Sequence, residues 1–246
     1  MRIGLFDSGL GGLTVLKTLL KKYPNNEYVY YGDTLNIPYG DKTKEELIIL
    51  AKKNVEFLLS KKVDMIIVAC GTVSSNCLDI LKELYDIPIV SILEPTIDYL
   101  NRSNYQNILV MATHATINSH IFKNNVNKNI CELETPKLVP MIENNKLLDI
   151  EEVLHDYLDD YLNNIDVLVL GCTHYPILKD YIKKVVGENT NILDMSDLIK
   201  IDNNGNKSLE IYFSKIDNKI IENTKNILGI NDLIIKNNWY NIKLFV

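Results

Sequence analysis

The chain has no long apolar segment and few cysteines, and each shortage excludes a class of protein. Its longest uninterrupted apolar runs, such as residues 65–70, extend over about six residues, whereas a membrane-spanning helix needs about 20. The amino-terminal apolar stretch meets Asp7 almost at once, which is unlike a signal peptide. Four cysteines among 246 residues are too few for a disulfide framework. We therefore expect a cytoplasmic protein with reduced thiols and no membrane partner.

A concentrated basic surface is also missing. The chain has 26 Lys and Arg against 32 Asp and Glu, for a net charge of −6. The basic residues are scattered and form no stripe with interleaved aromatic residues, so we expect no nucleic-acid partner. With 46% hydrophobic and 24% charged residues, the composition is that of an ordinary globular protein that can bury a core.

Short apolar runs alternate along the chain with helix-length amphipathic stretches. The runs lack polar alternation, which is typical of parallel strands covered on both faces. This rhythm predicts an α/β fold built on open parallel sheets with flanking helices. The expected strands are residues 2–6, 28–31, 65–69, 87–91, 108–111, 167–170, 192–193 and 210–213. The expected helices are residues 13–23, 44–60, 75–85, 117–124, 148–162 and 178–186.

Two segments of the chain repeat one pattern. Residues 63–70 and 165–172 each contain an aspartate, an apolar run, a small residue and a final cysteine, Cys70 or Cys172. Ligands of parallel sheets bind beyond the carboxyl ends of the strands, where both cysteines are expected. The repeat predicts two similar halves that place two thiols on opposite sides of one crevice.

Two facing thiols are suited to inverting a stereocentre. One sulfur removes a proton as a thiolate, and the other delivers a proton to the opposite face as a thiol. Asp7 is the expected proton partner of Cys70, and His174 that of Cys172. Both cysteines precede an expected helix, whose free N–H groups suit a carboxylate ligand. For the first of these helices, the expected capping residues are Thr72, Ser74 and Ser75.

Other interpretations of these residues remain open. A cysteine at a strand end is often only a small buried apolar residue. Metal binding is disfavoured, because the chain has no Cys-x-x-Cys and no pair of histidines at ligand spacing. The glycine-rich segment 7–12 lacks the spacing of a dinucleotide-binding loop. Cys77 is expected in the core, and Cys131 belongs to no motif.

Taken together, the motifs resemble those of glutamate racemases, in the cofactor-independent aspartate/glutamate racemase superfamily. The strongest are GLFDSGLGGLTV at residues 4–15, YGDT at 31–34 with PYG at 38–40, ACGTVSS at 69–75 and LGCTHYP at 170–176. Residues 112–116 and 139–143 match two weaker segments. The matches extend over residues 3 to 194 in the order of the family.

The resemblance implies an isomerase that interconverts L- and D-glutamate and supplies D-glutamate for peptidoglycan, without pyridoxal phosphate or a metal. In the family the first cysteine deprotonates the D enantiomer and the second the L enantiomer, which here implies Cys70 and Cys172. Asp7 is implied to assist Cys70, and His174, supported by Glu143, to assist Cys172. The residues implied to surround the substrate are Asp7, Ser8, Pro38, Tyr39, Gly40, Gly71, Thr72, Thr113, Thr116, Thr173 and His174. His114, His120 and His155 are expected at the surface without a role.

The resemblance also implies two pseudo-symmetric parallel-sheet α/β domains with the active site between them. Domain one is expected at residues 1–92 and 203–246, and domain two at 93–202. Family members are often homodimers, so a homodimer is possible here.

Two positions depart from the family pattern. Gly71 stands where the family usually has an asparagine that contacts the substrate, and the segment 194–209 lacks the usual longer helix. Because Gly71 removes a contact, a racemase of aspartate or of another acidic amino acid is an alternative. A binding protein for acidic amino acids without turnover is a second alternative, although both cysteines, Asp7 and His174 are present.

Overall fold

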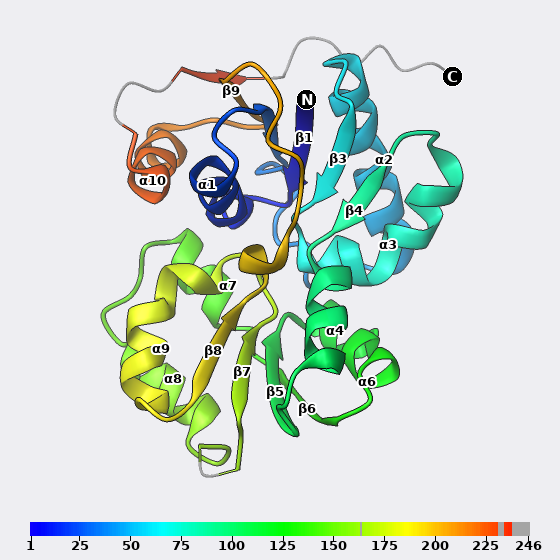
Figure 1. The fold of residues 1–246 in the computed structure, drawn as a ribbon. Helices are drawn as coiled ribbons and strands as arrows, with labels where there is room; N and C mark the ends of the chain where they lie inside the picture. The colour runs from blue at the N-terminus through cyan, green and yellow to red at the C-terminus, as the bar shows by residue number, and fades with distance from the viewer. Residues whose placement is uncertain (163, 231–233, 238–246) are drawn as a thin grey trace.

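The computed structural model describes residues 1–162, 164–230 and 234–237. Ten strands form two all-parallel sheets within these ranges. The two sheets lie in separate parts of the molecule, one above the other in Figure 1. The expected α/β class with two parallel sheets is confirmed. No helix in these ranges is both long and apolar enough to cross a membrane.

The first sheet has the order β10-β9-β2-β1-β3-β4. Apolar runs build its central strands, and five of the six residues of β1 are buried. The last segments of the chain return to this sheet as β9 and β10. The strands are β1 (Arg2–Asp7), β2 (Glu27–Gly32), β3 (Met65–Val68), β4 (Ile89–Ser91), β9 (Ser208–Phe213) and β10 (Ile235–Asn237).

The second sheet has the order β6-β5-β7-β8. It repeats the β2-β1-β3-β4 part of the first sheet, with β5 in the place of β1 and β7 in the place of β3. The repeat seen in the sequence is therefore a repeat of topology. The strands are β5 (Asn107–Ala112), β6 (Asn129–Glu134), β7 (Val167–Leu170) and β8 (Asn191–Asp194).

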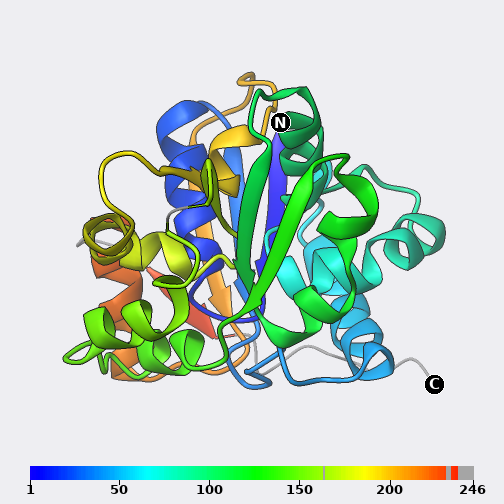
Figure 2. The same cartoon turned by 90° about the horizontal axis from the view of Figure 1, so that it is seen from below.

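Helices flank both sheets, as Figure 2 shows from below. A capping box begins α2, where the Glu46 N–H donates to Thr43 and the Thr43 N–H donates to the Glu46 carboxylate. The helices of the upper part in Figure 1 are α1 (Gly12–Lys22), α2 (Lys44–Ser60), α3 (Gly71–Leu84) and α10 (Asn218–Leu228). The others are α4 (Leu93–Arg102), α5 (His114–Asn118), α6 (Ile121–Asn125), α7 (Leu138–Glu143), α8 (Ile150–Leu158) and α9 (Lys179–Val186). Two 3-10 turns are η1 (Tyr175–Leu178) and η2 (Met195–Leu198).

Several expected elements need correction. The helix expected at residues 117–124 is broken into α5 and α6, because His120 adopts a left-handed backbone conformation. The strands β6 and β10 and the helices α4, α7 and α10 were not predicted. All residues of β6 are at least partly exposed, so it lacks the buried apolar run by which the other strands are recognised. The expected loop at residues 202–206 is confirmed, since no helix or strand lies between η2 and β9.

Candidate active site

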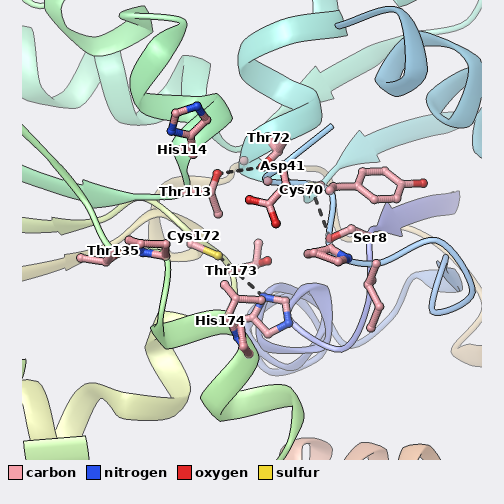
Figure 3. Close-up of a pocket in the computed structure, with 18 of the residues that line it drawn as sticks. Ser8, Asp41, Cys70, Thr72, Thr113, His114, Thr135, Cys172, Thr173 and His174 are labelled. Carbon is pink, nitrogen blue, oxygen red and sulfur yellow. Dashed lines mark hydrogen bonds between the residues drawn. The ribbon is translucent and has the colours of Figure 1, made fainter. Parts of the chain in front are cut away.

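A narrow cavity of about 50 Å³ lies between the two sheets, at the carboxyl ends of their central strands. Residues from both halves line it, and Cys70 and Cys172 lie on opposite sides of it (Figure 3). The expected residues that line it are Ser8, Pro38, Tyr39, Gly40, Cys70, Gly71, Thr72, Thr113, Glu143, Cys172, Thr173 and His174. The sequence repeat therefore brings the two thiols to one cavity, as predicted.

Cys70 stands between the end of β3 and the start of α3. Its backbone is extended and Gly71 is already helical, so Cys70 itself is the N-cap residue. Its thiol donates to the Ser8 hydroxyl at 3.7 Å. Burial, together with the nearby charge of Asp7, raises the pKa of Cys70 to about 12. We therefore expect Cys70 to be a thiol at neutral pH, with a proton to donate.

The helix that follows Cys70 begins four residues earlier than predicted. Thr72, Ser74 and Ser75 lie inside its first turns, so the expectation that they cap it is wrong. The Ser74 hydroxyl instead donates to the carbonyl oxygen of Val68, at the end of β3. The hydroxyl of Thr72 remains at the cavity.

Cys172 begins a chain of polar groups along the cavity wall. Its sulfur lies 3.7 Å from Nδ1 of His174, and Nε2 of His174 lies 2.6 Å from a carboxylate oxygen of Glu143. Burial alone would lower the pKa of His174, but the hydrogen bonds with Cys172 and Glu143 raise it well above its usual value. Burial of Glu143 opposes its ionisation, yet His174 holds the Glu143 pKa below its usual value. These hydrogen bonds therefore favour an imidazolium form of His174 beside the Cys172 sulfur.

Asp7 lies behind the cavity wall and is fully buried. One carboxylate oxygen accepts from the Thr173 hydroxyl at 3.1 Å, and the other from the Gly9 N–H at 2.9 Å. Asp7 is close enough to Cys70 for its charge to affect the Cys70 pKa. The first half's carboxylate is thus held by a residue next to the second half's cysteine.

Hydroxyl groups cross the cavity on the side away from His174. The hydroxyls of Thr72 and Thr113 lie 2.9 Å apart (Figure 3). The hydroxyl of Thr116 lies 3.1 Å from that of Thr113. Thr116 is buried behind Thr113 and does not line the cavity, so a direct substrate contact is not seen for it. Thr72 and Thr113 therefore present hydroxyls from opposite halves to whatever binds.

The loop that contains Tyr39 closes one side of the cavity. The Tyr39 hydroxyl donates to Asp33 at 2.6 Å and accepts from Asn54 at 3.3 Å. Pro38 follows a cis peptide bond, and the Gly40 carbonyl oxygen accepts from the Ala115 N–H of the other half. Tyr39 thus acts as a fixed part of the wall, with its hydroxyl already bonded.

Gly71 has no room for a side chain in this arrangement. A Cβ atom there would lie 2.8 Å from the carbonyl oxygen of Gly171, a main-chain atom of the other half. An asparagine at this position would require the two halves to lie further apart. Gly71 therefore fits the close approach of the two strand ends in this structure.

Some cavity residues were not predicted. Thr135 and Pro136 follow β6, and they were missed because β6 itself was missed. His114, expected at the surface without a role, is half-exposed at the cavity and contacts Glu134 at 2.9 Å. The other unpredicted lining residues are Ile37, Asp41, Val139, Pro140 and Gly171. The described ranges hold no group of three His, Cys, Asp or Glu side chains arranged for a metal ion.

Three of the four cysteines, Cys70, Cys77 and Cys131, should differ in the rate at which they react with iodoacetamide. Cys70 and Cys77 are buried and the pKa of each is raised to about 12, whereas Cys131 is partly exposed. Because the thiolate is the reactive form, Cys131 should be alkylated before Cys70 and Cys77 at pH 7.5. Peptide mass spectrometry over time measures the order, and unfolded protein, in which all four should react, is the control. Equal rates for Cys70 and Cys131 in the folded protein would contradict the expectation.

Comparison with known proteins agrees with this geometry. Residues 20–197 match the family model described as Asp/Glu/Hydantoin racemase. The chain is 38% identical over 244 residues to the glutamate racemase of Hydrogenobaculum sp. (strain Y04AAS1), covering 93% of each chain. Two solved structures of glutamate racemases share the fold. That from Aquifex pyrophilus has a TM-score of 0.83 and 35% identity, covering 96% of this chain and 98% of that one. That from Francisella tularensis, in complex with D-glutamate, has a TM-score of 0.83 and 30% identity, covering 96% and 95%. This chain therefore belongs to the Asp/Glu/Hydantoin racemase family and is an isomerase that acts on amino acids.

Proposed function

We propose that this protein is a glutamate racemase that works with two cysteines. The observation that carries the proposal is the pair of thiols on opposite sides of one narrow cavity, each with its own carboxylate nearby. The relatives named glutamate racemase, one of them with D-glutamate bound, support glutamate as the substrate. A racemase of aspartate or of another acidic amino acid, and a binding protein without turnover, are outcomes of the test below.

In the proposed reaction each sulfur works on one face of the α-carbon. Towards D-glutamate, the Cys172 thiolate takes the α-proton of L-glutamate, and the electrons of the broken C–H bond delocalise into the carboxylate. The Cys70 thiol then delivers its proton to the opposite face, so that one C–H bond breaks and one forms. Asp7 assists Cys70, and His174 with Glu143 assists Cys172. The reverse direction exchanges the two roles.

The remaining cavity residues are proposed to bind and orient the substrate. The free N–H groups at the start of α3, at Gly71 and Thr72, suit a carboxylate of the substrate. Hydroxyls at the cavity can donate to a carboxylate or accept from the ammonium group. The proposed contacts include Ser8, Pro38, Tyr39, Gly40, Thr113 and Thr173, with Thr116 acting through Thr113. The narrow cavity excludes water from the carbanion-like transition state.

The cellular setting is part of the same proposal. We place the protein in the cytoplasm, where it supplies D-glutamate for peptidoglycan without a cofactor or metal, as a possible homodimer. The proposed domains are residues 1–92 with 203–246, and 93–202. Residues 231–233 and 238–246 of the first domain lie outside the described residues.

Exchange of the α-proton in D₂O tests the proposal. We expect L-glutamate and D-glutamate each to lose the α-proton NMR signal while the optical rotation of the solution falls to zero. L-Aspartate should show little exchange under the same conditions. Exchange with aspartate alone would move the protein to the aspartate branch. Binding of glutamate without exchange, by folded and fully reduced protein, would contradict racemisation and favour a binding protein.

A further inference from the structure

The glycine-rich segment at the end of β1 approaches the proton-transfer groups of both halves. Gly9 and Gly11 lie between β1 and α1, and Gly12 is the first residue of α1. None of the three has a positive φ, so any residue could adopt their backbone conformation. Space, and not backbone conformation, is what requires glycine at these positions.

Two of these glycines face the second half of the protein. A Cβ atom on Gly9 would lie 2.8 Å from Oε1 of Glu143. One on Gly11 would meet the Thr173 hydroxyl, which donates to Asp7, and would lie 2.5 Å from Nδ1 of His174, so Gly11 approaches the proton partners of both cysteines. Between them, the Leu10 N–H donates to the same Glu143 oxygen at 3.3 Å. The segment therefore supports the carboxylate and imidazole that lead to Cys172.

The third glycine faces the first half. A Cβ atom on Gly12 would meet the side chain of Asp7, with Cγ at 3.0 Å, and the hydroxyl of Tyr30 at 2.9 Å. Asp7 is the carboxylate whose charge acts on Cys70. Neighbouring positions of one segment thus contact the proton partners of different cysteines.

We propose that Gly9 is a positioning residue for the Cys172 side of the reaction, and that Gly12 is a positioning residue for the Cys70 side. Gly9 leaves the space that the Glu143 side chain occupies, and Gly12 leaves the space that the Asp7 side chain occupies. A methyl group added at Gly9 would displace Glu143, and one added at Gly12 would displace Asp7. This inference rests on the two-cysteine function proposed above.

Displacing one proton partner should change the kinetics differently from a general loss of stability. The ratio of kcat/KM for the two enantiomers is fixed by an equilibrium constant of unity, so any variant lowers both values equally. The deuterium isotope effect on kcat/KM is not fixed by the equilibrium constant, so it can change differently for the two enantiomers. Slowing proton transfer at Cys172 makes removal of the α-deuteron from L-glutamate more rate-limiting and its removal from D-glutamate less so. Slowing transfer at Cys70 does the opposite.

The experiment compares G9A, G12A and a control variant. For each variant, the isotope effect on kcat/KM is measured with α-deuterated L-glutamate and with α-deuterated D-glutamate. In G9A the added methyl meets the end of a flexible side chain, so this variant should fold. We expect kcat/KM to fall about tenfold, in line with the cost of small misplacements at active sites. The isotope effect should rise with L-glutamate and fall with D-glutamate in G9A, and shift in the opposite sense in G12A.

The matched control is G4A, in the same strand as Asp7. A methyl there meets only apolar atoms of the core, with Leu58 Cδ1 at 3.0 Å and Val63 Cγ2 at 3.2 Å. It should lower the free energy of unfolding and leave the balance of the two isotope effects unchanged. If G12A does not fold, G9A carries the test alone. An unchanged balance in G9A would overturn the inference, whereas absence of α-proton exchange in the wild-type protein would overturn the proposed function itself.

Discussion

Alanine in place of either Cys70 or Cys172 should abolish racemisation. Each substitution removes the only group proposed to take or deliver a proton on one face of the α-carbon. We expect kcat/KM to fall by about 10⁴-fold or more, the upper end of what a positioned acid–base group contributes. Circular dichroism of glutamate solutions over time measures the loss, and both directions should be affected.

Cys77→Ala is the matched control for these variants. Cys77 is as deeply buried as Cys70 and lies in the helix that Cys70 begins, but it faces the core. Its loss should lower the free energy of unfolding by about 1 kcal/mol and leave racemisation intact. Activity close to wild type in C70A or C172A would disprove the two-cysteine mechanism, and loss of activity in C77A would show that the assay reports folding.

Glu143→Gln should have the second-largest effect, because it removes the charge that keeps His174 protonated. The two side chains are 3% and 13% exposed, and their hydrogen bond is 2.6 Å long. Without the carboxylate, the burial of His174 is less opposed, so its pKa should fall. We expect kcat/KM to fall about 10²-fold or more through the loss of this proton partner. The pH profile of kcat/KM should change shape as well as height.

The same variant should change the pH dependence of stability. The folded-state pKa of His174 is raised above 6.5, so its contribution is fully present below pH 6.5 and is lost as pH rises through the folded value. The folded-state pKa of Glu143 lies below 4.5. Its contribution to stability is therefore present above pH 4.5 and is lost as pH falls through the folded-state pKa. The difference in free energy of unfolding between wild type and E143Q should therefore be largest between pH 4.5 and 6.5.

Urea unfolding across this pH range measures the difference, which we expect to reach about 1–3 kcal/mol. The control is Asp159→Asn, which breaks an exposed pair of the same kind, with His155 at 2.8 Å. Solvent screens that pair, so its loss should change stability little at any pH. A difference for E143Q that stays constant from pH 4 to 9 would contradict the proposed charge state of the buried pair.

Much of the fold could be predicted from local sequence patterns. Strands such as β1 and β7 are mostly continuous apolar runs, because both faces of a parallel strand are covered, and such runs can be recognised in the sequence. The edge strand β6 has a weak pattern because none of its residues is fully buried, and the short helix α7 has one because it buries only Leu138 and Ile142. They were missed for that reason, and with them Thr135 and Pro136 of the cavity wall.

The candidate site divides in the same way. Cys70 and Cys172 stand directly after strands, so the rule that ligands bind at strand ends was enough to find them. The place of Glu143 came from the family pattern alone. Its helix gives no sign of facing His174, because that contact joins residues 31 positions apart through the packing of η1 and α7.

The sequence by itself therefore determined the class of fold, the repeat and the two thiols, because each depends on residues close together in the chain. The tertiary structure decided the rest. It placed Asp7 against Thr173, moved Thr116 behind Thr113, and set Gly71 against Gly171. These contacts join the two halves across the cavity, and their geometry depends on how closely the two sheets approach, which no local pattern in the chain encodes.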